Sequence, residues 1–223
     1  SVNDVGSTDG SVTNQALTAT ESQLTVDQWR EISFTVLDKA AKQADDYLQP
    51  CLEQGVPAAF ASDIDAKLLA LHASLSGYDA IDATAGLNED RLTDAFYALA
   101  NADVMMDDPN NISWFFSWKQ WPTLKKLAQL SEAQITGEGG GGVLRFKIPD
   151  IFGCPVYFTS NVATSTYHQN MLLHREAMAC GVQKNFNLEK FARTAKASTY
   201  SADILYGVKV VRSSHGILLN TTV

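Results

Sequence analysis

IPDIFGCPVYFTS, Ile148–Ser160, is the most informative segment of the chain, and it has a counterpart near the C-terminal end in YGVKVVRSSHGILLNTTV, Tyr206–Val223. Both segments are rich in β-forming residues, and each is broken by a glycine. In the first, a strand turns at Gly153 and restarts at Pro155, which indicates a sheet edge or a strand entry because proline cannot donate to a β-ladder. Neither segment carries a set of residues that could do chemistry, so both predict a structural framework.

Length and cysteine usage favour one globular unit. The 223 residues suffice to bury roughly 70% of the surface that the unfolded chain exposes, in two lobes or one. No apolar run approaches the roughly 20 residues that span a bilayer, and the first residues lack the basic and apolar regions of a signal peptide, so we expect no membrane contact. Cys51, Cys154 and Cys180 are odd in number and far apart, which favours buried thiols over a disulfide framework.

Charge is unevenly distributed along the chain. Up to Thr136 there are 20 acidic and 8 basic residues, a balance of −12, whereas from Gly137 onward there are 5 acidic and 9 basic residues, a balance of +4. This segregation suits copies that contact each other acid to base, although two separately solvated surfaces explain it as well. An acidic protein neutralises few phosphates, so any contact with DNA should be weak and non-specific.

The N-terminal part predicts an extended arm. Ser1–Glu21 is polar and too poor in apolar residues to pack alone. Apolar and polar residues then alternate through Gln23–Leu37, as in half-buried strands, and the two short runs there predict a long β-hairpin. An arm that cannot bury both faces on its own chain tends to lie on a neighbouring copy. The candidates for contact between subunits are Leu24, Val26, Trp29, Ile32, Phe34 and Val36.

Helical patterns follow the arm. Asp38–Leu75 predicts a helix that is interrupted around Gly55 and Pro57. Its second part carries an apolar stripe at helical spacing, which predicts a core-facing helix. Asp63 and Asp65 are two residues apart and point to different sides of a helix, so they indicate a solvated face and not a metal pair. The stripe consists of Phe60, Ile64, Leu68, Leu71 and Leu75.

The region that begins near Ala80 mixes helix and strand. Asn88 is typical of a helix N-cap because acidic residues fill the turn that follows it. Ile112–Phe116 predicts a short buried strand, and the tryptophans at 118 and 121 predict an aromatic face of the next helix. These tryptophans favour core or subunit packing over stacking of a base or a sugar. The glycine run Gly137–Gly142 enters a strand pattern without the Lys and Ser or Thr of a phosphate loop, which indicates a surface loop.

No catalytic or metal-binding motif is evident. The four histidines, at positions 72, 168, 174 and 215, show no ligand spacing for zinc. A cysteine nucleophile at Cys154 would need a histidine brought to it by folding. A Cys/His hydrolase therefore stays an alternative, but we predict no enzyme, no catalytic residue, no cofactor and no metal.

Between the two β-rich segments lies LLHREAMACGVQ, Leu172–Gln183. Together the three segments resemble the major capsid proteins of tailed double-stranded-DNA phages, which share the Hong Kong 97-like fold. The resemblance implies an α+β chain with an extended β-hairpin loop, a peripheral domain with a long spine helix, and an axial domain whose central sheet is flanked by helices. Within it, Leu172–Gln183 resembles a sheet strand and a short helix, and Tyr206–Val223 resembles a closing hairpin.

The resemblance also implies a division of the chain and a function. Copies would form pentamers and hexamers of an icosahedral head around double-stranded DNA, in the virion and, during assembly, in the host cytoplasm. Scaffolding, portal and decoration proteins are the further partners implied. The alternative is a tail-associated or adhesive structural protein. The divisions are 1–38 for the N-terminal segment and hairpin loop, 39–80 for the spine helix, 81–182 for the axial domain, 183–200 for the peripheral return strands, and 201–223 for the strands that close the axial domain.

Overall fold

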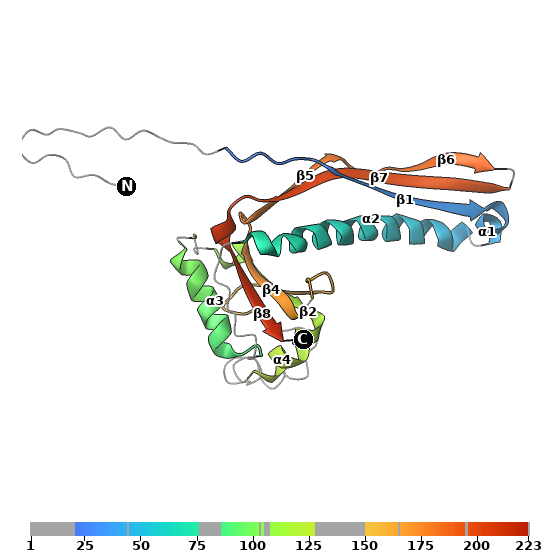
Figure 1. Cartoon of the computed structure of the whole chain (residues 1–223). Coiled ribbons are helices and arrows are strands. Elements are labelled where there is room, and N and C mark those ends of the chain that lie inside the picture. The colour runs from blue at the N-terminus through green and yellow to red at the C-terminus, as the bar shows by residue number, and fades with distance from the viewer. Residues whose placement is uncertain are drawn as a thin grey trace, which may run out of the picture.

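The computed structural model describes residues 21–43, 45–75, 86–102, 104, 108–127, 150–164, 166–194 and 196–222. Over these residues the chain is α+β and has two lobes, each built on a four-stranded sheet (Figure 1). Its main elements are β1 (Gln28–Leu37), α1 (Asp38–Gln43), α2 (Asp45–Leu69), α3 (Glu89–Asn101), β2 (Ile112–Ser117), α4 (Trp121–Lys126), β3 (Val156–Thr159), β4 (Tyr167–His174), β5 (Met178–Lys184), β6 (Leu188–Thr194), β7 (Ala197–Val210) and β8 (Gly216–Thr222).

The long lobe is a narrow sheet with one helix along it (Figure 1). Its central strand is β7, which pairs with β1 along one edge and with β5 and β6 in turn along the other. Helix α2 covers one face of this sheet, where Val56 and Phe60 pack against Ala202, Ile204 and Tyr206. Successive residues of a strand point to opposite faces, so the other residues of β7 point away from the helix.

The predicted β-hairpin over residues 23–37 is wrong. Residues Gln28–Leu37 form one strand, and its partner is β7 of the same chain, with Gln28 opposite Tyr206 and Leu37 opposite Ala197. Alternating residues predicted a strand correctly, but alternation does not identify the partner strand. The arm therefore has a partner strand in its own chain, contrary to the expectation from the sequence.

The segment that precedes β1 crosses the long sheet at a pair of glycines. Gly181 and Gly207 are cross-strand partners in β5 and β7. A Cβ at Gly207 would overlap the carbonyl oxygen of Thr25, and a Cβ at Gly181 would lie 2.8 Å from Cδ2 of Leu24. Only a residue without a side chain permits so close an approach of a second backbone. The Nζ of Lys209, on the same face, donates to the carbonyl of Gln23 at 2.6 Å.

The compact lobe holds the larger core. Its sheet has the order β3-β2-β4-β8, in which only the β2/β3 pair is parallel. Helix α3 lies beside this sheet (Figure 1) and begins as predicted, because Oδ1 of Asn88 accepts from the backbone N–H of Arg91 at 2.9 Å. The predicted strand at Ile112–Phe116 is confirmed as β2. The fully buried large side chains of this core include Leu99, Ile112, Trp114, Phe116, Leu124, Leu172, Ile217 and Leu219.

The turn at Gly153 is also confirmed. The backbone of Ile151 and that of Cys154 exchange two hydrogen bonds, at 2.9 and 3.0 Å, around Phe152 and Gly153. Both central residues have positive φ, 53° and 76°, which is the geometry of a tight type I′ turn. The glycine meets this requirement without strain, and β3 starts directly after Pro155.

Helix α2 is continuous, so the predicted interruption around Gly55 and Pro57 is wrong. An internal proline costs a helix roughly 3 kcal/mol because it removes one hydrogen bond and crowds the preceding turn. Val56 and Phe60 flank Pro57 and are buried against β7, and this packing offsets the local cost. Among the described residues, none of the helices is long and apolar enough to cross a membrane.

Two expectations for the last third are corrected. Leu172–Gln183 contains no helix: β4 ends at His174, a turn follows, and β5 begins at Met178. Tyr206–Val223 is not a hairpin, because β7 belongs to the long sheet and β8 to the compact one. The boundaries expected at 182/183 and 200/201 therefore cut through β5 and β7. The glycine run at 137–142 lies outside the described residues.

Candidate functional site

The long lobe is the first candidate for a functional surface, since it carries the six residues predicted to contact other subunits. Ile32 and Phe34 lie on the face covered by α2 and pack at the margin of its apolar cluster. Val36 shares this face by alternation and is half-buried. Leu24 lies over Gly181 of the same chain. Val26 lies in the same segment as Leu24, which crosses the sheet at Gly181 and Gly207. Packing within the chain thus covers part of this set of six residues.

Trp29 differs from the other five. It points to the opposite face of the sheet, where 73% of it is exposed. Its indole Nε1 donates to Oδ2 of Asp203 at 2.8 Å, and the Nζ of Lys184 lies 2.6 Å from Oδ1 of the same carboxylate. The hydrogen bond from Lys184, followed by that from Trp29, lowers the pKa of Asp203. The indole is thereby oriented while its rings stay open to solvent.

Polar residues elsewhere on this open face pair across strands. Thr35 and Thr199 share a hydrogen bond between their hydroxyl groups at 3.1 Å. The hydroxyl of Ser201 donates to Oε1 of Glu31 at 2.8 Å. Such cross-strand pairs suit a sheet face that meets water or a polar partner surface. Trp29, near one end of β1, and Leu37, at the other end, are the large apolar side chains exposed on β1.

A half-buried polar contact joins α2 to the long sheet. The hydroxyl of Tyr206 donates to Oδ2 of Asp63 at 2.6 Å, and the Nε of Arg30 lies 3.3 Å from the same oxygen. Burial, reinforced by the Asp63 carboxylate, raises the pKa of Tyr206 to about 12. Asp63 therefore fixes the position of the helix on the sheet, which is a more specific role than the solvated face expected from the sequence.

The second candidate is the junction between the lobes, which we define as residues 174–178 and 210–216. The first stretch connects β4 to β5 and the second connects β7 to β8, so both pass from one sheet to the other. Backbone N–H groups of Val211 and Arg212 donate to the carbonyl of Ala177 at 2.9 and 3.2 Å. The two connections are thus hydrogen-bonded to each other.

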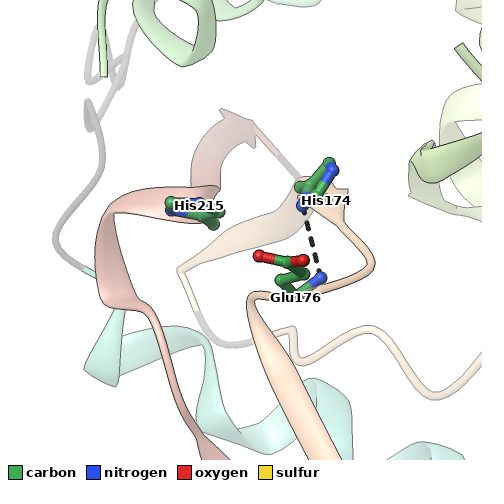
Figure 2. A group of neighbouring side chains, drawn as sticks. All are labelled: His174, Glu176 and His215. Atoms are coloured by element: carbon green, nitrogen blue, oxygen red, sulfur yellow. Dashed lines mark hydrogen bonds between the residues drawn. The ribbon is translucent and has the colours of Figure 1, made fainter. Parts of the chain in front are cut away.

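The junction brings together His174, Glu176 and His215 (Figure 2). Each offers one ligand atom, and these atoms lie within 4.8 Å of one another. The two imidazole rings meet edge to face, with centroids 5.6 Å apart. Burial, followed by the charges of Arg212 and His174, lowers the pKa of His215 against the opposing effect of Glu176. Sequence spacing missed this group, because its members come from two connections that meet only in the folded chain.

The two cysteines that the structure describes, Cys154 and Cys180, do not form a catalytic site. Cys154 is buried in the core of the compact lobe, and burial, together with the charge of Asp150, raises the pKa of its thiol. A nucleophilic cysteine needs the opposite shift, so its environment gives the hydrolase alternative no support. Cys180 is exposed, against the expectation of buried thiols, although partial desolvation of its sulfur raises the pKa of the thiol.

A hollow of about 470 Å³ lies between α2 and the compact lobe. Apolar side chains such as Leu68, Phe115 and Tyr157 form much of its wall, and Asp65 contributes a carboxylate. His174 and Arg175 border it on the junction side. This arrangement suits an apolar insertion better than it suits acid and base chemistry.

Comparison with solved structures finds the same architecture elsewhere. A structure of Mycobacterium phage Che8 matches with a TM-score of 0.73 at 19% identity, over 98% of this chain and 80% of that one. The capsid structure of the cyanophage P-SCSP1u matches with a TM-score of 0.71 at 14% identity, over 99% of this chain and 80% of that one. The chain has the Hong Kong 97-like capsid fold. The mature capsid of bacteriophage PhiM1 agrees, with a TM-score of 0.64 at 14% identity, over 99% of this chain and 79% of that one.

Support for the capsid fold among known proteins thus comes from structural similarity. No protein-family description and no curated protein matches the chain. The matches to solved structures extend over nearly the whole chain, so they include both lobes and the junction. The α+β class and the fold inferred from the sequence are confirmed.

Proposed function

We propose that this chain is a major capsid protein, a structural subunit whose copies form the pentamers and hexamers of an icosahedral phage head around double-stranded DNA. The observation that carries the proposal is the match of the whole two-lobed architecture to phage structures, two of which are described as capsids. In this proposal the compact lobe is the axial domain and the long lobe is the peripheral domain together with the extended arm.

The shape of the long lobe supports self-association. Among the described residues, a helix covers one face of the sheet, and the other face stays open around Trp29, away from the crossing at residues 23–26. The residues that line the covered face, such as Ile32 and Phe34, stay half-buried. A neighbouring copy that lies along the arm would cover the remaining apolar area, and burial of apolar surface contributes about 25 cal/mol per Å². The six arm residues remain our candidates for this contact.

Charge and location complete the proposal. The chain carries a net charge of −8, so packaged DNA would be contacted weakly and without sequence preference. The protein would reside in the virion and, before assembly, in the host cytoplasm. Scaffolding, portal and decoration proteins are the other partners that we propose.

Electron microscopy of the purified chain over a range of concentrations tests the proposal. Rings or closed shells are expected in negative stain, and size-exclusion chromatography should show a high-mass species that grows with concentration. A stable monomer at every concentration would contradict the proposal. Fibres or tubes in place of closed shells would favour the tail-associated or adhesive alternative.

A further inference from the structure

We propose that His174, Glu176 and His215 bind a divalent transition-metal ion of the zinc class, and that the ion ties together the two connections between the lobes. His174 is the last residue of β4, Glu176 lies in the turn after it, and His215 lies directly before β8. Their ligand atoms lie within 4.8 Å of one another. The side chains converge from both connections (Figure 2).

The ligand set selects the class of metal. Two imidazole nitrogens and one carboxylate oxygen suit zinc and its neighbours, whereas calcium and magnesium favour sites made of oxygen alone. Bonds of roughly 2.0–2.2 Å to a tetrahedral ion place ligand atoms roughly 3.4 Å apart. The cluster must therefore contract by about 1.4 Å. Glu176 is half exposed and can supply most of this movement. Three protein ligands leave one position for water.

The protonation pattern of His174 is suited to binding. Its Nδ1 accepts a hydrogen bond from the backbone N–H of Glu176 at 3.3 Å, drawn as the dashed line in Figure 2. That nitrogen therefore carries a lone pair. A bond of this length is weak, so an ion can replace it. Since His174 is buried, its ring is already held in place.

The guanidinium of Arg212 occupies the position that a metal ion would take in this cluster. Its Nη1 lies 2.8 Å from Oε2 of Glu176 and 3.3 Å from Nε2 of His215. More than half of its side chain is exposed, so the guanidinium can leave without unfolding the junction. A bound metal and the inward position of Arg212 compete, because Nη1 contacts both Oε2 of Glu176 and Nε2 of His215 and two positive charges this close repel each other. This competition gives the proposal a signature that adventitious surface binding lacks.

The proposal is tested by isothermal titration calorimetry, in which ZnCl₂ is titrated into the EDTA-treated full chain. We expect one ion per chain, at least tenfold weaker binding in His215→Asn and Glu176→Gln, and at least threefold tighter binding in Arg212→Gln. The visible spectrum with CoCl₂ should show the intense bands of a four- or five-coordinate ion. The matched controls are His72→Asn and Cys180→Ser, which remove a histidine and an exposed thiol outside the cluster.

Three results would overturn the proposal. One is zinc binding that survives both His215→Asn and Glu176→Gln. Another is binding that disappears in His72→Asn or Cys180→Ser. The third is an unchanged or weaker affinity in Arg212→Gln, since the guanidinium and the ion must compete. Because His174 is buried and its variants risk misfolding, the test uses only exposed or half-exposed positions, and circular dichroism verifies that each variant is folded.

Discussion

The two lobes bury their side chains to very different degrees. In the compact lobe, Trp114 and Phe116 are fully covered and stack with ring centroids 5.6 Å apart. In the long lobe, α2 covers one face of the sheet, and residues such as Ile32 and Phe34 stay half-buried at the edge of a small apolar cluster. The compact lobe therefore closes a core of its own, whereas the described part of the long lobe leaves apolar side chains only half-buried.

This difference indicates where stability and assembly are encoded. Substitutions in the compact core should act on the free energy of unfolding of the single chain. Substitutions on the open face of the arm should act on association and leave the single chain nearly unchanged. The junction belongs to neither class, since it fixes how one lobe is held against the other.

The largest expected effect is in the compact core. Trp114→Ala removes a fully buried indole that stacks on Phe116, so it should lower the free energy of unfolding by about 3–5 kcal/mol. Urea denaturation followed by circular dichroism measures the change. A loss below about 1 kcal/mol would show that this core is loosely packed and would remove the contrast between the lobes.

The next effect is at the glycine crossing. Gly207→Ala places a Cβ onto the carbonyl of Thr25, and relief of such an overlap costs about 1–3 kcal/mol. The segment at 24–26 should shift or detach, which hydrogen exchange and limited proteolysis would report. The matched control is Gly55→Ala, whose Cβ meets nothing within 4 Å. In the interior of α2 it should stabilise the chain by about 0.5–1 kcal/mol. Equal behaviour of the two variants would contradict the close approach.

Local signals in the sequence predicted local structure well. The N-cap at Asn88, the turn at Gly153 and the strand at Ile112–Phe116 each depend on residues within a few positions of one another, and all three are confirmed. The partner of β1 was missed because it lies in β7, far along the chain. Alternation is a property of one strand and does not identify its neighbour.

The same limit explains the remaining errors. The interruption expected at Pro57 follows from helix propensity, which packing of α2 on β7 overrides. The expected hairpin at Tyr206–Val223 assumed that consecutive strands pair, yet the chain changes sheets between them. His174 and His215 come together only where the two connections between the lobes meet. Spacing within one segment could not reveal this cluster.

A smaller effect is expected where α2 is held to the sheet. Tyr206→Phe removes the hydrogen bond to Asp63 and should cost about 1–2 kcal/mol at neutral pH. The pKa of Tyr206 rises from 10.0 to about 12 in the folded chain. The folded state thus holds this proton more tightly, and the contribution is complete below pH 10 and lost between about pH 10 and 12.

Denaturation of both proteins from pH 7 to 12 measures this pH dependence. The stability difference between the wild type and Tyr206→Phe should shrink above pH 10. A difference that stays constant up to pH 12 would mean that the hydroxyl does not contact the carboxylate of Asp63. Asp63→Asn is the matched variant, since it keeps a hydrogen-bond acceptor but removes the charge that helps to raise the pKa of Tyr206.

The smallest effect on the single chain is expected at the most exposed aromatic residue of the arm. Trp29→Ala should change the free energy of unfolding by less than about 0.5 kcal/mol, because the ring is 73% exposed and makes one exposed hydrogen bond. If the open face meets a neighbouring copy, the same change should raise the concentration needed for assembly at least tenfold, as loss of an aromatic anchor does at other interfaces. Light scattering measures that threshold.

Tyr97→Ala, on the equally exposed face of α3, is the control for general loss of aromatic surface. Assembly of Trp29→Ala at the wild-type threshold would show that subunits meet elsewhere and that the arm is held by its own chain alone.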